Sequence, residues 1–121
     1  MLRIVIADDH EVARRGIRSL LEGHPGWEVC GEAKDGREAV ELATKTKPDL
    51  VLLDIGMPNL NGLEAARQIL ATTPNVAILI LTMHDSDNVF SEVLRAGARG
   101  FLLKSDAGRD LVAAVDALQS Q

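Results

Sequence analysis

Aromatic residues are scarce in this sequence: tyrosine is absent, and the aromatic set consists of Trp27, Phe90 and Phe101. The core therefore has to be built mainly from leucine, isoleucine, valine and alanine. With 46% hydrophobic residues in a chain of 121, such a core can form without disulfides or structural metals. Cysteine is scarce as well, because Cys30 stands alone and cannot form an internal disulfide. The length predicts a single domain over residues 1–121.

Long apolar runs and an excess of positive charge are missing too. The apolar stretch within residues 1–7 is about five residues long, short of the roughly 7–15 in the core of a signal peptide, and no run approaches the length of a membrane span. The formal net charge of −5 disfavours a broad surface for nucleic acid or anionic lipid, since either requires clustered lysine and arginine. We therefore expect a cytoplasmic protein that contacts no membrane and, through these residues, no nucleic acid.

Five short segments have the pattern of β-strands. Four are nearly continuous apolar runs, at residues 2–7, 50–53, 76–81 and 101–103, which is typical of strands buried on both faces of a parallel sheet. The fifth, residues 27–33, alternates between apolar and polar residues, and we expect it nearer an edge of the sheet.

Between these segments the spacing of apolar residues changes to that of amphipathic helices. The predicted helix faces are Val12, Ala13, Ile17, Leu20 and Leu21; Ala39, Val40 and Ala43; Leu63, Ala66, Ile69 and Leu70; Val89, Phe90, Val93 and Leu94; and Leu111, Ala114, Val115 and Leu118. The candidate N-caps are Asp35, Asp85 or Ser86, and Ser105 or Asp106, and the candidate helix stops are Gly23 and Gly97.

Strands that alternate with helices predict parallel strands joined by right-handed crossovers. Five such units are too few to close a (β/α)₈ barrel. We therefore predict an α/β fold of the flavodoxin-like, doubly wound (βα)₅ type, with a parallel five-stranded sheet of order 2-1-3-4-5 and helices on both faces.

In such a sheet, ligands bind beyond the carboxyl ends of the strands, where the strand order reverses. Asp8 and Asp9 follow the first predicted strand, Asp54 ends the third, Thr82 follows the fourth and Lys104 follows the fifth. The first and third strands flank the reversal point, so the three aspartates should converge. Carboxylates held this close repel one another unless some are protonated or a cation joins them.

A site with two or three carboxylates selects a hard cation such as Mg²⁺. Asp54 lies in VLLDIGMPNLNG, between a buried run and a turn rich in glycine, proline and asparagine, which should hold its carboxylate rigidly as both metal ligand and nucleophile. Attack of a carboxylate on phosphorus gives an aspartyl phosphate, and no general base is needed because the carboxylate is already ionised at pH 7. Thr82 can donate a hydrogen bond to one phosphoryl oxygen and Lys104 can neutralise another.

Four stretches, ADDH, LLDIGMPNLNG, LTMHD and GFLLKS, resemble the receiver domain of bacterial two-component response regulators. LTMHD, RAGARGFLLK and GEAKDGREAVELA are most similar to the NarL/FixJ (LuxR) type, whose members usually carry a C-terminal helix-turn-helix DNA-binding domain. The resemblance covers essentially the whole chain. It implies a phosphoprotein of a two-component system that regulates transcription through a DNA-binding domain outside these residues.

The resemblance also assigns roles to residues. Asp54 would be the phosphoacceptor, Asp9 a direct Mg²⁺ ligand, Asp8 a ligand largely through water, and the backbone carbonyl of Gly56 a further ligand. The phosphoryl donor would be a sensor histidine kinase.

The resemblance also implies which residues would respond to phosphorylation. Thr82 and Phe101 would be the switch residues and Lys104 would pair with the phosphoryl group. The domain would assist its own phosphorylation and dephosphorylation without being a turnover enzyme. A phosphorylation-linked homodimer is expected by resemblance, with its interface left open.

Several positions depart from the family pattern. Ser105 replaces the proline that commonly follows the lysine, so the resemblance does not fix a cis peptide there. Met83 narrows access to Asp54, and His84 becomes the candidate modulator of dephosphorylation, because Gly56 has no side chain for that task.

The remaining candidates receive structural interpretations. We interpret His10 as a first-turn helix residue rather than a metal ligand, because Mg²⁺ prefers oxygen. His24 is interpreted as solvated and without a partner, Cys30 as a small core-facing hydrophobe, and Trp27 as a packing residue of an edge strand.

Two rival functions stay open. A phosphatase of the haloacid dehalogenase class also forms an aspartyl phosphate, but it carries a D-x-D motif after its first strand, where this chain has Asp8-Asp9-His10. A receiver-like interaction module that no longer uses phosphate is the second rival, and it is disfavoured because every acidic, hydroxyl and lysine position is filled. A nucleotide-binding enzyme is disfavoured because neither glycine-rich phosphate-binding motif is present.

Overall fold

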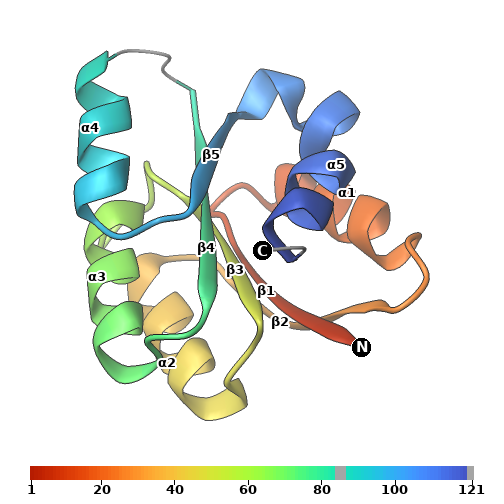
Figure 1. Ribbon diagram of the computed structural model, residues 1–121, viewed down its shortest axis with the longest axis horizontal. Helices are drawn as coiled ribbons and strands as arrows, with labels where there is room; N and C mark the ends of the chain where they lie inside the picture. Colours follow the sequence, from red (N-terminus) through yellow and green to blue (C-terminus); the bar gives the residue numbers. More distant parts are fainter. Residues whose placement is uncertain (84–86, 120–121) are drawn as a thin grey trace.

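The computed structural model of the chain describes residues 1–83 and 87–119 (Figure 1). A parallel five-stranded sheet of order β2-β1-β3-β4-β5 lies between two layers of helices, which confirms the predicted doubly wound α/β fold. The elements in chain order are β1 (Leu2–Ala7), α1 (Glu11–Glu22), β2 (Trp27–Ala33), α2 (Gly36–Thr46), β3 (Leu50–Asp54), α3 (Gly62–Thr72), β4 (Ala77–Thr82), α4 (Asp87–Arg95), β5 (Gly100–Leu103), a 3-10 turn (Lys104–Asp106) and α5 (Ala107–Gln119).

The two layers of helices divide the core into two apolar clusters. Helices α1 and α5 cover one face of the sheet, and α2, α3 and α4 cover the other (Figure 1). Successive residues of β1 alternate between them, with Ile4 and Ile6 packing toward α1 and α5 and Val5 packing toward α2 and α3. The central strands are therefore buried on both faces, as their continuous apolar runs predict. Within residues 1–83 and 87–119, no helix combines the length and the hydrophobicity of a membrane span.

The predicted helix caps and stops have different outcomes, and two of them, Asp35 and Gly97, are confirmed. The side chain of Asp35 caps α2 by accepting a hydrogen bond from the backbone N–H of Glu38 at 2.8 Å, as predicted. Gly97 follows α4 with a φ of +90°, which suits glycine at a helix end. Ser105 and Asp106 lie in the 3-10 turn that precedes α5. The other candidate caps, Asp85 and Ser86, lie outside the described residues.

The predicted apolar face of α1 is wrong at Val12, which is 85% exposed. The buried residues of this helix are Ile17 and Leu21, one turn apart. At about 100° per residue, Val12 lies about 140° around the helix from Ile17, too far to reach the same core. Three other residues of the predicted helix faces, Leu20, Phe90 and Leu94, are also exposed. Met83, which directly follows β4, is exposed as well.

His24 is a second correction, because it does have partners. Its ring stacks on that of Trp27 with the centroids 3.8 Å apart, and its Nδ1 lies 2.9 Å from the carbonyl oxygen of Pro25. Trp27 itself is buried at the start of the edge strand β2, as predicted.

The pairing of β1 with β2 contains a one-residue shift. Ile4 pairs with Val29, but the next residue of β1 pairs with Gly31, so Cys30 is the extra residue of β2. Cys30 packs against the core on the α2 side, as predicted. Beyond the shift, Glu32 is the partner of Ile6, and because paired residues share a face of the sheet, Glu32 is placed on the α1 side.

The loop between Asp54 and α3 is held against the start of α2. The side-chain amide of Asn59 donates a hydrogen bond to Asp35 Oδ2 at 2.9 Å. Gly36 packs so closely on this loop that an added Cβ would lie 1.9 Å from the carbonyl oxygen of Leu60. The cap of α2 therefore also fixes the loop that follows Asp54.

Replacing Gly36 by alanine should lower the free energy of unfolding by about 1–3 kcal/mol, because the new methyl group meets backbone atoms that have to move. Gly16 gives the matched control, since it lies in the interior of α1 and an added Cβ there would have no neighbour within 4 Å. Gly16→Ala should instead raise stability by about 0.5–1 kcal/mol. Urea unfolding followed by Trp27 fluorescence measures both, and equal stabilities for Gly36→Ala and the parent would contradict the close contact.

Candidate functional site

A cluster of charged side chains occupies the carboxyl ends of the central strands. Asp8, Asp9 and His10 follow β1, and Asp54 is the last residue of β3. Each of these four residues offers a metal-ligating atom, and these atoms lie within 4.8 Å of one another. Lys104, directly after β5, reaches into the same cluster. The structure thus brings together the acidic residues and the lysine that the sequence places at strand ends.

Two of the carboxylates are buried. Asp8 is 0% exposed and Asp54 is 5% exposed. Asp8 Oδ1 accepts a hydrogen bond from the backbone N–H of His10 at 2.8 Å, whereas Asp8 Oδ2 faces the ammonium group of Lys104. Asp54 Oδ1 accepts a hydrogen bond from the backbone N–H of Gly56 at 3.2 Å. Both carboxylates therefore have one oxygen held by a local turn and one oxygen directed to other partners.

The ammonium group of Lys104 lies between these two carboxylates. Its Nζ is 2.9 Å from Asp8 Oδ2 in an ion pair, and it donates a hydrogen bond to Asp54 Oδ2 at 3.0 Å. Burial by itself would lower the pKa of Lys104, but hydrogen bonding and attraction from Asp8 and Asp54 outweigh it, and the pKa is raised above its usual value. Lys104 is thus a built-in counter-ion for the buried pair.

Asp9 and His10 form the exposed rim of the cluster. His10 Nδ1 lies 3.3 Å from Asp8 Oδ1, 3.3 Å from Asp9 Oδ1 and 3.4 Å from Lys104 Nζ. The interpretation of His10 as a first-turn helix residue is wrong, because α1 begins at Glu11 and His10 is an extended N-cap residue. Its position directly after the aspartate pair, in the same turn, is the sequence signal that could have placed it in the site.

A cavity of about 230 Å³ opens beside Asp54. Its lining residues are His10, Asp54, Ile55, Gly56, Thr82 and Met83. Thr82 is only 1% exposed, so it meets the cavity from within the sheet, while Met83 is largely exposed at the rim. His84 lies outside the described residues.

Phe101 lies on the α4 side of β5, and its ring centroid is 5.3 Å from that of Phe90 at an interplanar angle of 48°. It is partly buried and packs against the core shared by α2, α3 and α4. The peptide bond between Lys104 and Ser105 is trans, as are all the others in the described residues.

The donor set fits a hard divalent cation. Asp8, Asp9 and Asp54 supply carboxylate oxygens, the ligands that Mg²⁺ prefers, within 4.8 Å of one another. The carbonyl of Gly56, beside Asp54 in the cavity, remains a predicted further ligand.

Residues 4–116 match the family model described as response regulator receiver domain. Transcriptional regulatory protein DegU of Brevibacillus brevis is 42% identical over 114 residues, which cover 94% of this chain and 48% of DegU. The chain spans about half the length of the curated relatives that it matches.

Solved structures are similar over nearly the whole chain. The signal receiver domain of the putative response regulator NarL from Mycobacterium tuberculosis is 34% identical, with a TM-score of 0.92 and coverage of 99% of this chain and 98% of that chain. RcsB from Salmonella enterica serovar Typhimurium, bound to promoter rprA in the presence of the phosphomimetic BeF3−, is 31% identical, with a TM-score of 0.88 and coverage of 98% and 99%.

Replacing Lys104 by methionine should lower the free energy of unfolding at pH 7, because Asp8 and Asp54 then face each other without their counter-ion. We expect a loss of about 1–3 kcal/mol, below the roughly 3–5 kcal/mol of a fully buried pair, since the site is partly open to water. Urea unfolding of the two proteins measures the difference.

The pH dependence of that difference follows from the raised pKa. The folded chain binds the Lys104 proton more tightly than the unfolded chain, so the stabilisation is complete below the ordinary lysine pKa of about 10.4 and is lost as the pH rises through the folded value. The stabilities of the parent and Lys104→Met should therefore converge only at a pH above the raised pKa of Lys104. A difference that stays constant from neutral to strongly alkaline pH would show that Lys104 does not stabilise through its charge.

Proposed function

The chain belongs to the response regulator receiver domain family, and on that premise we propose that Asp54 accepts a phosphoryl group from a sensor histidine kinase in a Mg²⁺-dependent reaction. The resemblance to receivers of the NarL/FixJ type, predicted from the motifs, is confirmed by these matches. The family belongs to two-component response regulators, and relatives of the chain are transcriptional regulatory proteins. The proposed reaction is the input step of a signalling domain.

The placement of Asp54 carries this proposal. Its carboxylate is fixed at the end of a buried strand, lines a cavity, and has a lysine ammonium 3.0 Å away. In the proposed step, a carboxylate oxygen of Asp54 bonds to phosphorus while the bond from phosphorus to the donor atom breaks, and the donor leaves with that electron pair.

The neighbouring side chains stabilise the charge of the transferring group. Lys104 has three N–H donors, so it can turn from the Asp54 carboxylate to a phosphoryl oxygen without leaving the cluster. Thr82 lines the same cavity and has a hydroxyl group for a second phosphoryl oxygen. Asp9, Asp54 and the Gly56 carbonyl would hold Mg²⁺ directly and Asp8 largely through water, and the bound ion would neutralise phosphoryl oxygens.

Phosphorylation would act on the rest of the domain as a population shift. The phosphoryl group would favour the arrangement in which Thr82 moves toward it and Phe101 follows, because that arrangement binds the new charge more tightly. Phe101 packs against Phe90 of α4, so this movement would alter the surface of α4, β5 and α5. The changed surface would favour a homodimer and control a DNA-binding domain, as the resemblance to regulators of the NarL/FixJ type implies.

Replacing Asp54 by asparagine should abolish acid-stable, hydroxylamine-sensitive labelling by acetyl phosphate with Mg²⁺, because the amide cannot attack phosphorus. Intact mass gives the measurement, as the gain of one phosphoryl group per chain. Asp110→Asn is the matched control, since Asp110 lies on α5 and its carboxylate pairs with Arg109. The control should be labelled like the parent. Persistent labelling of Asp54→Asn at the same stoichiometry would refute the assignment, and repeated turnover of phosphomonoesters by the parent would favour a phosphatase instead.

Beryllium fluoride with Mg²⁺ should increase the average mass of the parent chain in sedimentation equilibrium, because the proposed switch alters a surface that already exposes Phe90 and Leu94. Asp54→Asn, which lacks the carboxylate that holds the phosphoryl mimic, should keep one mass with and without the reagent. A parent chain that binds the reagent but stays monomeric would exclude dimerisation through these residues.

A further inference from the structure

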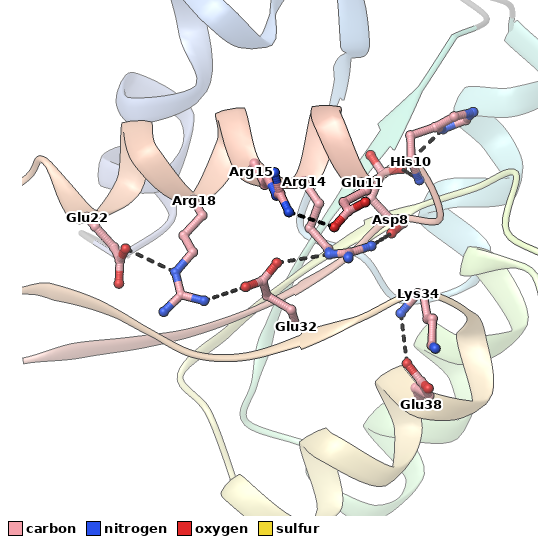
Figure 2. Close-up of polar contacts among 10 residues, drawn as sticks. All are labelled: Asp8, His10, Glu11, Arg14, Arg15, Arg18, Glu22, Glu32, Lys34 and Glu38. Atoms are coloured by element: carbon pink, nitrogen blue, oxygen red, sulfur yellow. Dashed lines mark hydrogen bonds and ion pairs between the residues drawn. The ribbon is translucent and has the colours of Figure 1, made fainter.

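We propose that Arg14 is a positioning residue of the divalent-cation site: its guanidinium fixes the turn that carries Asp8 and Asp9, and thereby sets the affinity for Mg²⁺ (Figure 2). This inference deepens the proposed function, since it rests on the same acidic site. Arg14 does not contact the reacting group. From the start of α1, it acts through its hydrogen bond to the backbone carbonyl of Asp8.

The backbone of Asp8 is held from two directions. Its N–H donates a hydrogen bond to the carbonyl oxygen of Ala33 on β2 at 3.0 Å. Its carbonyl oxygen accepts a hydrogen bond from Arg14 Nη1 at 2.7 Å. Asp8 is fully buried and lies where β1 ends and the turn begins, so these two bonds decide the direction in which the turn leaves the sheet. Without Arg14 the buried carbonyl loses the partner that the side chain supplies.

The guanidinium is itself oriented by Glu32. Arg14 Nε donates to Glu32 Oε1 at 2.9 Å, so one planar group bridges β2 and the Asp8 carbonyl (Figure 2). Burial would raise the pKa of Glu32, but hydrogen bonds and attraction from Arg18 and Arg14 outweigh it and hold the pKa below its usual value. Glu32 therefore stays charged at neutral pH and keeps Arg14 in place.

A guanidinium suits this bridge better than an ammonium. Its donors diverge in a rigid plane, so Nε can address a carboxylate while Nη1 addresses a carbonyl in another direction. The side chain of Arg14 is 17% exposed, which limits the competition from water at both bonds. A lysine would keep the charge but could not hold the two acceptors in one fixed geometry.

The neighbouring arginines provide matched controls. Arg18 binds the other oxygen of Glu32 and also pairs with Glu22, and Arg15 pairs with Glu11, but neither contacts Asp8 in the interactions of the described residues (Figure 2). Replacing Arg18 therefore removes the same charge from the same carboxylate and leaves the Asp8 carbonyl bond in place.

Charge and positioning predict opposite effects on the affinity. Removing a cation near a cation-binding site should, by electrostatics alone, strengthen Mg²⁺ binding. Loss of a group that orients a metal ligand should weaken it, typically by roughly 10–100-fold. A weakened affinity in an Arg14 variant therefore cannot come from the change in net charge.

The test is calorimetric titration of Mg²⁺ into this chain without any phosphoryl donor. We expect Arg14→Gln to raise the dissociation constant roughly 10-fold or more, and Arg18→Gln to leave it unchanged or lower it. Arg14→Lys should also weaken binding, and it serves as the folded alternative if Arg14→Gln fails to fold by circular dichroism. Under acetyl phosphate, the Mg²⁺ concentration for half-maximal labelling should rise in the same order while the rate at saturating Mg²⁺ changes little.

Three outcomes would overturn the positioning role: equal dissociation constants for the parent and the Arg14 variants, equal weakening by Arg18→Gln, or no Mg²⁺ binding by the parent chain. Failure of the proposed function has a different signature. In that case the parent binds Mg²⁺ and the Arg14 variants still weaken it, but Asp54 is not labelled by any phosphoryl donor.

Discussion

Repulsion between two buried carboxylates is the constraint on which this structure depends. Asp54 ends β3 and Asp8 follows the adjacent strand β1, so the sheet itself brings the two buried carboxylates together. Lys104, delivered by the edge strand β5, compensates that charge by contacting both. Such a cluster keeps the proposed metal ligands and the proposed nucleophile, Asp54, side by side, which is the combination that a phosphoryl group with a divalent ion requires.

The cluster is held from outside as well as from within. On one side, Asp35 caps α2 and accepts a hydrogen bond from Asn59, so the loop after β3 is tied to the start of a helix. On the other side, Arg14 ties the turn after β1 to β2 through Glu32. Each acidic loop is thus anchored to an element, α2 or β2, that contributes no carboxylate to the cluster itself. Rigid supports of this kind would keep the carboxylates close together if Lys104 turned away from them.

The sequence was sufficient for the features that depend on periodicity and on strand ends. Apolar runs alternating with helical spacing predicted the sheet order, and the carboxyl-end rule placed Asp54 and Lys104 at one edge. The sequence was insufficient where the direction of a side chain determines its contacts. Helical spacing includes Val12 in a face that the tertiary packing does not cover, and it does not distinguish a first-turn residue from the N-cap position that His10 occupies. Arg14 gave no signal, because a buried bridge and a solvated charge look the same in a helix pattern.

The extra residue in β2 gives this edge strand two halves of opposite phase. Trp27 and Val29 face α1 before Cys30, and Glu32 faces α1 after it, with Ala33 turned to the other layer. A prediction from strict alternation therefore assigns every residue of β2 beyond Cys30 to the wrong face of the sheet. A chimaera that imports a straight strand of the same composition would send the glutamate into the alanine-rich layer and a methyl group toward the arginines. The β2 segment of this chain can therefore be exchanged only for one with the same offset, because the spacing, and not residue identity alone, decides which face each side chain occupies.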